Sequence, residues 1–510
     1  MRRLWRILAS RAFLIAILLL LQISFLFMWA YRTALYYSIL PAIDLIALFV
    51  AIYVVNKDED NQYKIGWIFL ILGLPVIGTL LFLLCFGRKM PKRLANGTIA
   101  ANERMRGLLC QDDAVIEELR QEAPSPFREF YSGVYREGFP VYRNTDVKVY
   151  DSGEEFFPDL LDALSQARKF IFLEYYIINP GRMWDSVLEV LRRKVEEGVE
   201  VKLIYDDFGC IRYLPRRYHR LLNEYGIETY QFNRMRPALL VTMNNRDHRK
   251  LCIIDNEIGF TGGINLSDEY INETHPYGYW RDSACRLSGE AVQTMTVMFL
   301  GMFSYLRKDE ALIDYTRYLQ KTSVPGREGC YYQPFSDTPT DDTDTGLNVH
   351  LNLVANARRY IYIDTPYLVL NSDMRTALCL AAYNGVDVRI MTPHVPDKKA
   401  VFEITCSNYE KLIKGGVRIF EYKPGFNHRK NYVADDEMCL VSSINSDYRS
   451  YYLQFESGVL MRDEKTAVQM RQEFEKGLEE CVEITMDDCM SVGILRRGFR
   501  SILALLAPLF

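Results

Sequence analysis

From about residue 145 onward, the second half of the chain repeats the first. Three motifs recur in the same order: 166–176 matches 356–366, 198–205 matches 385–392, and 226–230 matches 416–420. The first pair reads QARKFIFLEYY and NARRYIYIDTP. A repeat of this length is typical of related structural units that pack against each other. The sequence therefore predicts two similar lobes in the soluble part.

Each copy alternates helical and extended patterns. The helical stretches Trp184–Glu197 and Met374–Asn384 end near glycine and lead into short β-branched runs. This alternation predicts an α/β fold of βαβ units, with a largely parallel sheet and helices on its faces. The Thr-, Asp- and Pro-rich segment Ser336–Gly346 separates the copies and is expected to be a solvated surface linker, because its acidic residues lack metal-ligand spacing.

Charge and cysteine content limit the partners and the compartment. The 510 residues carry 61 Lys+Arg and 65 Asp+Glu, a net charge of -4, so the basic excess of a nucleic-acid-binding protein is absent. The 11 cysteines are scattered without a CxxC pair. They are expected to be buried thiols in a reducing compartment, which places the soluble part in the cytoplasm.

The first 95 residues are strongly apolar. Ala12–Tyr31 and Ile65–Gly87 are uncharged and long enough to cross a hydrocarbon core of ~30 Å. Thr33–Val55 is a third candidate span, although it contains Pro41 and Asp44. A cleaved signal peptide is the rival interpretation of the first segment, but its apolar run exceeds the usual ~7 to 15 residues. We expect a membrane anchor.

Two basic clusters and the C-terminal segment bear on topology. Three crossings would put the clusters on opposite sides of the membrane, and two crossings would put both inside. We expect the second cluster and the catalytic domain to be cytoplasmic. Ser491–Phe510 mixes arginines with apolar residues, so it either lies flat in an anionic leaflet or docks on the domain as an amphipathic helix. The clusters are Arg2, Arg3, Arg6 and Arg11, and Arg88, Lys89, Lys92 and Arg93.

Two of the six histidines begin the same motif. His248 is followed by Lys250, Asp255 and, after Gly262-Gly263-Ile264, by Asn265. In the second copy His428 is followed by Lys430, Asp435 and, after Ser442-Ser443-Ile444, by Asn445. Both read HxKxxxxD with Asn seventeen residues after His. A single HxK means little, but its recurrence at matching positions of a repeat is a poor fit to chance.

This residue set suits chemistry on a phosphate ester. In an extended segment His248 and Lys250 share one face while Arg249 points away. Lysine stabilises charge on non-bridging oxygens, asparagine donates a hydrogen bond, and histidine attacks phosphorus or carries a proton. Two copies supply one nucleophile and one general acid. The remaining histidines are expected to be structural or superficial: His219, His275, His350 and His394.

The doubled HxKxxxxD with its GGxN and SSxN sequences resembles the phospholipase D superfamily over residues 140 to 485. The hairpin element WIFLILGLPVIGTLLFLLCFG at 67–87, Glu174–Tyr176 and Trp280–Asp282 narrow the resemblance to bacterial cardiolipin synthases. The resemblance implies two similar phospholipase D-like lobes with a pseudo-twofold shared active site that needs no metal or other cofactor. The expected units are 1–95 (membrane-spanning), 96–140 (connecting), 141–325 (first lobe), 326–346 (linker), 347–488 (second lobe) and 489–510 (amphipathic segment).

The resemblance also implies residue roles. Lys250, Lys430, Asn265, Asn445 and Ser443 would hold the phosphate, and Asp255 and Asp435 would brace the strand. Asp282 and Glu456 would orient the imidazoles through their second nitrogen. Two positions depart from the superfamily pattern: Gly263 replaces a serine and Ser442 replaces a glycine.

By the same resemblance, one phosphatidylglycerol would transfer its phosphatidyl group to histidine and lose glycerol, and a second would attack to give cardiolipin. His248 is expected to be the nucleophile and His428 the acid, with the reverse left open. The alternatives are another phosphatidyltransferase, a hydrolytic phospholipase D, a nuclease of the superfamily, and a membrane-anchored scaffold with an inactive site. The expected partners are a phospholipid membrane and phosphatidylglycerol, with no nucleic acid, and the oligomeric state is open. The expected location is the cell membrane, as a multi-pass protein.

Overall fold

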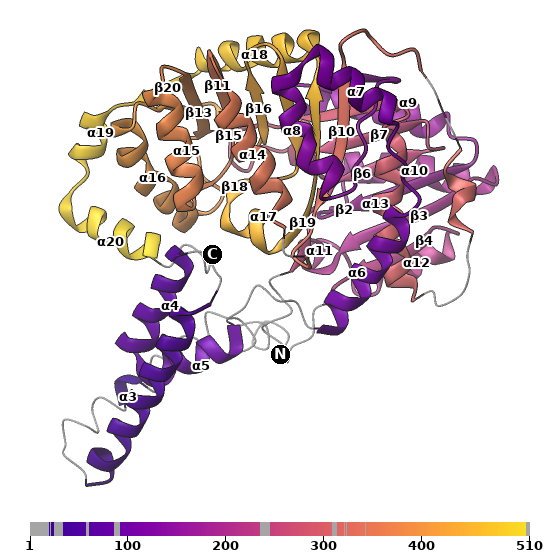
Figure 1. Cartoon of the computed structure of the whole chain (residues 1–510). Coiled ribbons are helices and arrows are strands. Elements are labelled where there is room, and N and C mark those ends of the chain that lie inside the picture. Colours follow the sequence, from indigo (N-terminus) through magenta and orange to yellow (C-terminus); the bar gives the residue numbers. More distant parts are fainter. Residues whose placement is uncertain are drawn as a thin grey trace.

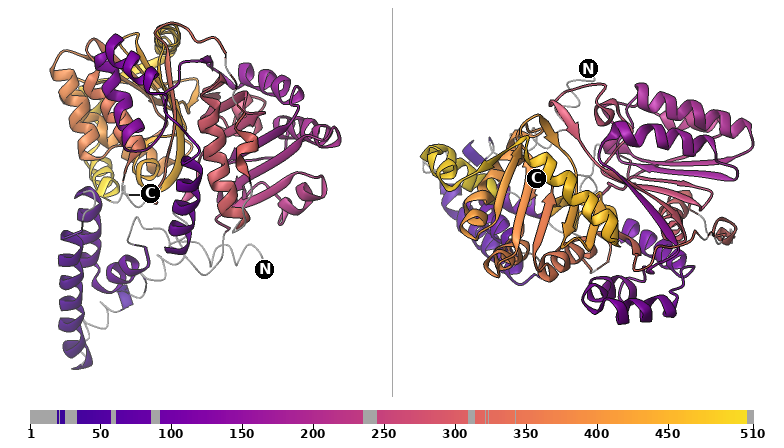
Figure 2. Two further views of the ribbon diagram at one scale, coloured as in Figure 1. Left: turned by 45° about the vertical axis from the view of Figure 1, so that its right-hand side comes forward. Right: turned by 90° about the horizontal axis from the view of Figure 1, so that it is seen from above.

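The computed structural model describes residues 20, 22–24, 34–57, 61–85, 92–234, 245–308, 314–320, 322, 324–341 and 343–505. Most of the chain forms two α/β lobes that lie side by side, each built on one twisted sheet (Figures 1 and 2). The N-terminal helices extend from the lower edge of these lobes (Figure 1).

The first lobe contains a seven-stranded sheet in the order β1-β9-β7-β6-β2-β3-β4. Only β2, β3 and β4 are parallel to one another, and the remaining neighbours are antiparallel. The strands are β1 (Thr145–Tyr150), β2 (Phe170–Tyr175), β3 (Glu200–Asp206), β4 (Glu228–Phe232), β6 (Leu251–Ile254), β7 (Ile258–Gly262) and β9 (Ala284–Gly289).

The second lobe repeats this order as β10-β19-β17-β16-β11-β13-β14, with β20 added at the edge. Again only β11, β13 and β14 are mutually parallel. The strands are β10 (Tyr331–Asp337), β11 (Tyr360–Asp364), β13 (Asp387–Pro393), β14 (Arg418–Tyr422), β16 (Asn431–Ala434), β17 (Met438–Ser442), β19 (Gln454–Arg462) and β20 (Cys481–Ile484). The matching strand orders confirm the two similar lobes predicted from the repeat.

The prediction of a largely parallel sheet is wrong for both lobes. Helices join β2 to β3 and β3 to β4, the pairs that are parallel neighbours, whereas β6 and β7 are joined by a tight turn. The amide of Glu257 donates to the carbonyl of Ile254 at 2.9 Å, and Asp255 and Asn256 have φ of 56° and 60°. Two consecutive left-handed residues define a type I′ turn, which favours an antiparallel hairpin. The turn at Asp435 and its neighbour in the second lobe has the same geometry.

Helices cover both faces of the sheets. On the outer faces lie α9 (Gly153–Ser165), α10 (Arg182–Glu196), α12 (Tyr218–Glu224), α14 (Thr345–Asn356), α15 (Ser372–Tyr383) and α16 (Lys399–Lys414). Two long helices, α13 (Val292–Arg307) and α18 (Glu464–Leu478), pack between the lobes. The region between the sheets is one apolar core, because Phe172 and Met295 of the first lobe join Val459 and Phe474 of the second in a single buried cluster. The lobes are therefore held by a shared core.

The structure gives the bounds of the two predicted helices and of the segments predicted to link the units. α10 and α15 confirm the predicted helices to within about two residues at each end. The segment predicted to be a solvated linker is only partly so: Ser336 and Asp337 end the buried strand β10, and α14 begins at Thr345. The connecting segment 96–140 is helical: it contains most of α6 (Lys92–Arg106), α7 (Asp113–Glu122) and α8 (Pro124–Tyr135).

The N-terminal region contains α3 (Ala34–Val55), α4 (Asn61–Gly73) and α5 (Pro75–Cys85). The stretch Ile65–Gly87, predicted to be one helix, is therefore two helices that fold back on each other, since the rings of Trp67 and Phe82 lie 5.7 Å apart. This geometry agrees with a hairpin element and not with a single straight span. Within the described ranges, no helix is both long enough and apolar enough to cross a bilayer. Most of the predicted span Ala12–Tyr31 lies outside the described residues.

The C-terminal segment forms α19 (Met486–Ser491) and α20 (Ile494–Leu505). Arg496 and Arg500 of α20 both bind the carboxylate of Glu403 on α16, which docks this face of the helix on the second lobe. The opposite side exposes Ile494 and Leu495, which are 85% and 87% accessible. The helix is thus docked on the domain and also presents apolar side chains to its surroundings.

Candidate active site

Two short strands bring each histidine to the opposite lobe. β5 (Arg246–Asp247) pairs with the start of β19, and β15 (Gly425–Asn427) pairs with β8 (Tyr279–Arg281). The backbone hydrogen bonding between lobes extends one residue beyond each strand. The amide of His248 donates to the carbonyl of Phe455 at 2.9 Å, and the amide of His428 donates to that of Arg281 at 2.7 Å. The backbone of each HxK motif is therefore fixed by the other lobe.

The predicted orienting carboxylates bind the histidines crosswise. Nδ1 of His248 lies 3.0 Å from both oxygens of Glu456 in the second lobe. Nδ1 of His428 lies 2.6 Å from Oδ2 of Asp282 in the first lobe. Because Nδ1 faces a carboxylate in both cases, Nε2 is the ring nitrogen left for chemistry. All four side chains are buried at the interface between the lobes.

The two lysines lie on the same side as the histidines. Nζ of Lys250 donates to the carbonyl of His248 at 2.5 Å, and Nζ of Lys430 lies 2.8 Å from Nδ1 of His428. Burial lowers the pKa of Lys250 to about 7 and that of Lys430 to about 8. The ammonium of Lys430 also lowers the pKa of Lys250. The free site is thus a confined cluster of cations that an anion would stabilise.

The pKa values of the two imidazoles and of their two carboxylate partners are shifted in different directions. Burial, followed by Lys430, lowers the pKa of His428 to about 3, and burial with the two lysines holds the pKa of His248 well below its usual value. Burial raises the pKa of Glu456 to about 8, although Lys250 and Ser443 oppose the rise. Burial also acts to raise the pKa of Asp282, but Lys430 and His428 outweigh it and lower the value. The histidines are therefore neutral in the free site.

The predicted phosphate ligands occupy different environments. Asn265 accepts from the amide of Ile177 at 2.9 Å and donates to the hydroxyl of Tyr270 at 2.7 Å. Oδ1 of Asn445 is buried without a partner among the described residues. Ser443 donates to Glu456 and accepts from the amide of Ser457. In this structure Ser443 therefore contacts the carboxylate that binds His248.

The glycine at the matching position of the first lobe is explained by space. A Cβ atom on Gly263 would lie 2.1 Å from Oδ1 of Asp282. Asp282 is one methylene shorter than its counterpart Glu456 and its carboxylate lies closer to the backbone, so serine cannot fit at 263 without moving it. The other departure, Ser442, accepts from the amide of Ile444 at 3.2 Å and donates to the carbonyl of Lys430.

Both motif aspartates bind backbone amides at the start of a strand. Asp255 accepts hydrogen bonds from the amides of Arg168, Lys169 and Phe170 at 2.7 to 2.8 Å. Asp435 accepts from the amides of 358, 359 and 360 at 2.7 to 3.0 Å. Each carboxylate ties the β-hairpin turn to the start of the adjacent strand, β2 or β11. This is the bracing position expected from the resemblance.

Aromatic side chains that no sequence pattern indicated surround the imidazoles. The ring of Tyr176 lies 4.9 Å from that of His248. The rings of Tyr270, Trp280 and Phe426 lie 5.1 to 5.7 Å from that of His428. Tyr176 and Trp280 were noted only as marks of resemblance. No spacing in the sequence relates Tyr270 or Phe426 to a histidine, because the contacts depend on the fold.

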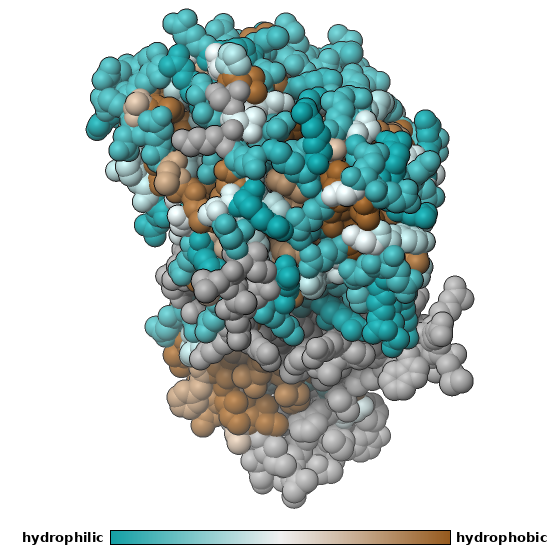
Figure 3. All heavy atoms as spheres, turned by 90° about the vertical axis from the view of Figure 1, so that its right-hand side faces the viewer, coloured by the Kyte–Doolittle hydropathy of each residue, from teal (hydrophilic) through white to brown (hydrophobic). Residues whose placement is uncertain are grey.

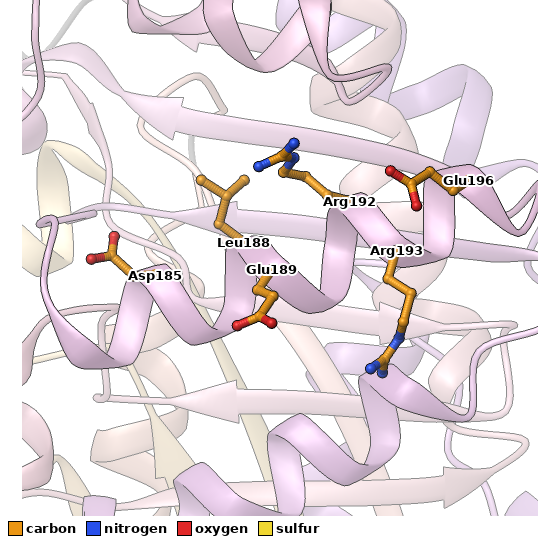
Figure 4. A pocket seen from close by; sticks show the side chains of 6 residues that line it. All are labelled: Asp185, Leu188, Glu189, Arg192, Arg193 and Glu196. Carbon is orange, nitrogen blue, oxygen red and sulfur yellow. The ribbon is translucent and has the colours of Figure 1, made fainter.

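The remaining histidines and the surface hollows lie outside this cluster. His350 is buried and contacts the hydroxyl of Tyr451 at 2.9 Å, while His394 pairs with Glu421 at 2.8 Å. A hollow of about 400 Å³ runs along α10 and includes none of the motif residues (Figure 4). Its lining residues are Asp185, Leu188, Glu189, Arg192, Arg193 and Glu196. In the part of the chain that the structure describes, no group of three or more His, Cys, Asp or Glu side chains could hold a metal ion.

Comparison with known proteins follows the same division into lobes. The family model described as "Cardiolipin synthase, PLD-like domain" matches residues 160–300 and 351–478. The model described as "Phospholipase_D-nuclease N-terminal" matches residues 42–87. Among solved structures, the phosphatidylserine synthase of Haemophilus influenzae Rd KW20 has a TM-score of 0.56 and 15% identity, over 75% of this chain and 96% of that chain. The last comparison concerns the fold alone.

Two curated relatives are similar along most of the chain. A protein of Streptococcus mutans serotype c (strain ATCC 700610 / UA159), described as uncharacterized, is 37% identical over 90% of this chain and 99% of its own length. Cardiolipin synthase 2 of Bacillus anthracis is 35% identical over 72% of this chain and 71% of its own. The two lobes and their paired HxK motifs are those of a phospholipase D-like protein. More narrowly, the chain belongs to the cardiolipin synthase family.

Proposed function

We propose that the protein is a cardiolipin synthase, a phosphatidyltransferase that converts two molecules of phosphatidylglycerol into cardiolipin and glycerol. In the first step Nε2 of His248 attacks phosphorus, a P–N bond forms, and the P–O bond to glycerol breaks while His428 donates a proton to the leaving oxygen. In the second step His428 takes the proton of a hydroxyl group on the second phosphatidylglycerol. That oxygen attacks phosphorus and the P–N bond breaks, so that protons balance over the cycle.

The observation that carries this proposal is the crosswise pairing of each histidine with a carboxylate of the other lobe. It gives one centre with two Nε2 atoms and two ammonium groups, which is the set that a double displacement on a phosphodiester requires. The family membership supplies the lipid class.

Substrate binding would change the protonation of this site. A phosphodiester anion between Lys250 and Lys430 would offset the charges that now lower the pKa of both histidines. One imidazole can then hold the proton that the leaving glycerol needs. Lys250, Lys430, Asn265 and Asn445 would contact the phosphate oxygens, whereas Ser443 would act through Glu456.

The reaction is tested with the full chain purified in detergent and phosphatidylglycerol labelled in its headgroup and acyl chains. Cardiolipin and glycerol should appear in equal amounts. Phosphatidic acid as the sole product would show that water is the acceptor and the protein is a hydrolytic phospholipase D. Transfer to an alcohol other than phosphatidylglycerol would indicate another phosphatidyltransferase. No turnover at all would favour a scaffold.

We also propose that the protein resides in the cell membrane with the catalytic lobes on the cytoplasmic side. Support comes from the apolar residues that α3, α4 and α5 expose and from the apolar side of α20. A multi-pass arrangement with two crossings accords with the fold-back of α5 on α4, because a hairpin returns to the side from which it starts. Both basic clusters would then face the cytoplasm. Labelling of introduced single cysteines in intact cells tests this topology, and modification of a residue near 90 from outside the cell would refute it.

A further inference from the structure

Residues 207–217, between β3 and α12, expose apolar side chains beside arginines. Phe208, Ile211 and Tyr213 are 40%, 45% and 40% accessible. Arg212, Arg216 and Arg217 are exposed, and none of them forms an ion pair with another described residue. Exposed apolar side chains interleaved with cations are typical of segments that lie in the headgroup region of an anionic bilayer.

This segment borders the His248 half-site. Asp206 accepts from the amides of Phe208 and Gly209 at the start of α11 (Asp207–Cys210), at 2.8 and 3.0 Å. The same side chain accepts from the amide of Asp247, the residue before His248, at 3.1 Å. Cys210 donates to the carbonyl of Tyr176, whose ring lies 4.9 Å from that of His248. The segment is thus fixed both to the backbone that leads to His248 and to the aromatic residue beside it.

The segment also lies on the side of the molecule that carries the N-terminal helices. Tyr448 on α17 (Tyr448–Tyr452) stacks on Tyr63 of α4 at 5.3 Å. Leu453, which follows α17, accepts from Asn245, which precedes β5, at 3.1 Å. Figure 1 shows α11 at the lower edge of the lobes, the edge from which α3 to α5 extend. Figure 3 shows hydrophobic atoms gathered at that end of the molecule.

We propose that residues 207–217 form a membrane-inserting lip at the mouth of the active site, and that their partner is the surface of an anionic phospholipid bilayer. Phe208, Ile211 and Tyr213 enter the interface while the arginines bind headgroup phosphates. The lip shortens the distance that a lipid headgroup must rise to reach the histidines while its acyl chains stay in the bilayer. This inference rests on the proposed function, because it concerns the entry of a lipid substrate.

Insertion can be measured without turnover. In an Ile211→Trp variant of the full chain, the added emission should shift to the blue and be quenched by brominated acyl chains in vesicles of phosphatidylcholine with phosphatidylglycerol. Leu380→Trp is the matched control, since Leu380 is an exposed apolar residue, 55% accessible, on α15. Equal quenching at both positions, or none at 211, would overturn the proposal. Weaker quenching in vesicles of phosphatidylcholine alone is expected from the arginines.

Kinetics separate the lip from the chemistry. Ile211→Asp should raise the apparent KM for phosphatidylglycerol in vesicles about tenfold. Its turnover of monomeric dihexanoyl phosphatidylglycerol, which needs no membrane, should match that of the wild type and of Leu380→Asp. Equal losses on both substrates, or no loss on vesicles, would refute the lip. A wild-type protein that converts neither substrate would refute the proposed function instead, and the quenching experiment would then decide the inference alone.

Discussion

Nδ1 of His248 lies 3.0 Å from both carboxylate oxygens of Glu456, a residue of the other lobe and 208 positions further along the chain. Asp282 of the first lobe likewise binds His428 of the second lobe. Neither lobe therefore contains a complete half-site. The pairing makes the contact between lobes part of the proposed catalytic site, because a shift of one lobe would remove both carboxylates from their histidines.

Removal of either orienting carboxylate should reduce turnover more than binding. For Glu456→Gln and Asp282→Asn we expect kcat to fall on the order of 10² to 10⁴-fold, because the imidazole loses the partner that fixes its tautomer and supports its charge. The KM should change little, since the lysines remain. Initial rates in detergent micelles measure both constants. Glu483→Gln, at an exposed carboxylate on β20, is the control and should behave as wild type. A rise in KM alone would contradict the orienting role.

Replacing either histidine should abolish transfer. His248→Ala and His428→Ala should each lower turnover by on the order of 10³-fold or more, because a double displacement fails when one half is missing. Rapid quenching of the wild type with phosphatidylglycerol labelled in its acyl chains should trap a phosphatidyl-enzyme modified at His248, and none should form in His248→Ala. Modification found on His428 alone would reverse the assignment of nucleophile and acid. Substantial turnover by either variant would mean that the doubled site is not the catalyst.

The lowered pKa values of Lys250 and Lys430 predict that activity falls at a lower pH than ordinary lysines would allow. Both must be protonated to hold the phosphate, and their pKa values in the free protein are about 7 and about 8. Since charge is lost as pH rises through these values, kcat/KM should fall above about pH 7 to 8, well below the ordinary lysine pKa of ~10.4. Rates at constant ionic strength measure this limb. Lys250→Arg stays charged, so the lower transition should vanish from its residual activity. A flat profile to the pKa of ordinary lysine would contradict the prediction.

The motif aspartates should affect stability more than catalysis. Asp255→Asn keeps a residue that tolerates the positive φ of 56° but loses the charge and one acceptor for three amides. We expect a cost of about 1–2 kcal/mol and a fall of a few degrees in Tm. At temperatures below the Tm of the variant, its kcat should stay within about twofold of that of the wild type. Thermal unfolding and rates on the same sample test this, and loss of activity at unchanged Tm would refute it.

Local patterns predicted much of the fold, and long-range pairing supplied the rest. The recurrence of QARKFIFLEYY as NARRYIYIDTP predicted two lobes, and it falls on β2 and β11, which occupy matching positions in the two sheets. The antiparallel pairing of β6 with its neighbours was missed because Asp255-Asn256 was interpreted only as part of a motif. It is also a type I′ turn signal. The resemblance implied that Glu456 orients an imidazole, but the sequence did not predict that this imidazole is His248, because the pairing depends on the contact of β5 with β19.

At the fold-back of α4 and α5, a single proline changed the structure that the average hydropathy of the segment predicted. Hydropathy counted Ile65–Gly87 as one span, but Pro75 has no amide proton and begins a new helix directly after Leu74. Gly78 makes the tight reversal feasible, because a Cβ there would lie 2.1 Å from the carbonyl of Leu70. The Gly-Leu-Pro sequence at 73–75 was the available signal.

The unequal pair Gly263 and Ser443 provides a test of the geometry at His428. Gly263→Ala should lower kcat by about tenfold or more, because the new Cβ would lie 2.1 Å from Asp282 and push the carboxylate away from the imidazole. Ser443→Ala adds no atoms and removes the hydrogen bonds of the hydroxyl to Glu456 and to the backbone of Ser457, so its loss should be smaller. In an Asp282→Ala background the Gly263→Ala change should cost almost nothing further, since the clash has lost its partner. Additive losses in that double variant, measured as kcat at equal Tm, would show that Gly263 acts through some contact other than Asp282.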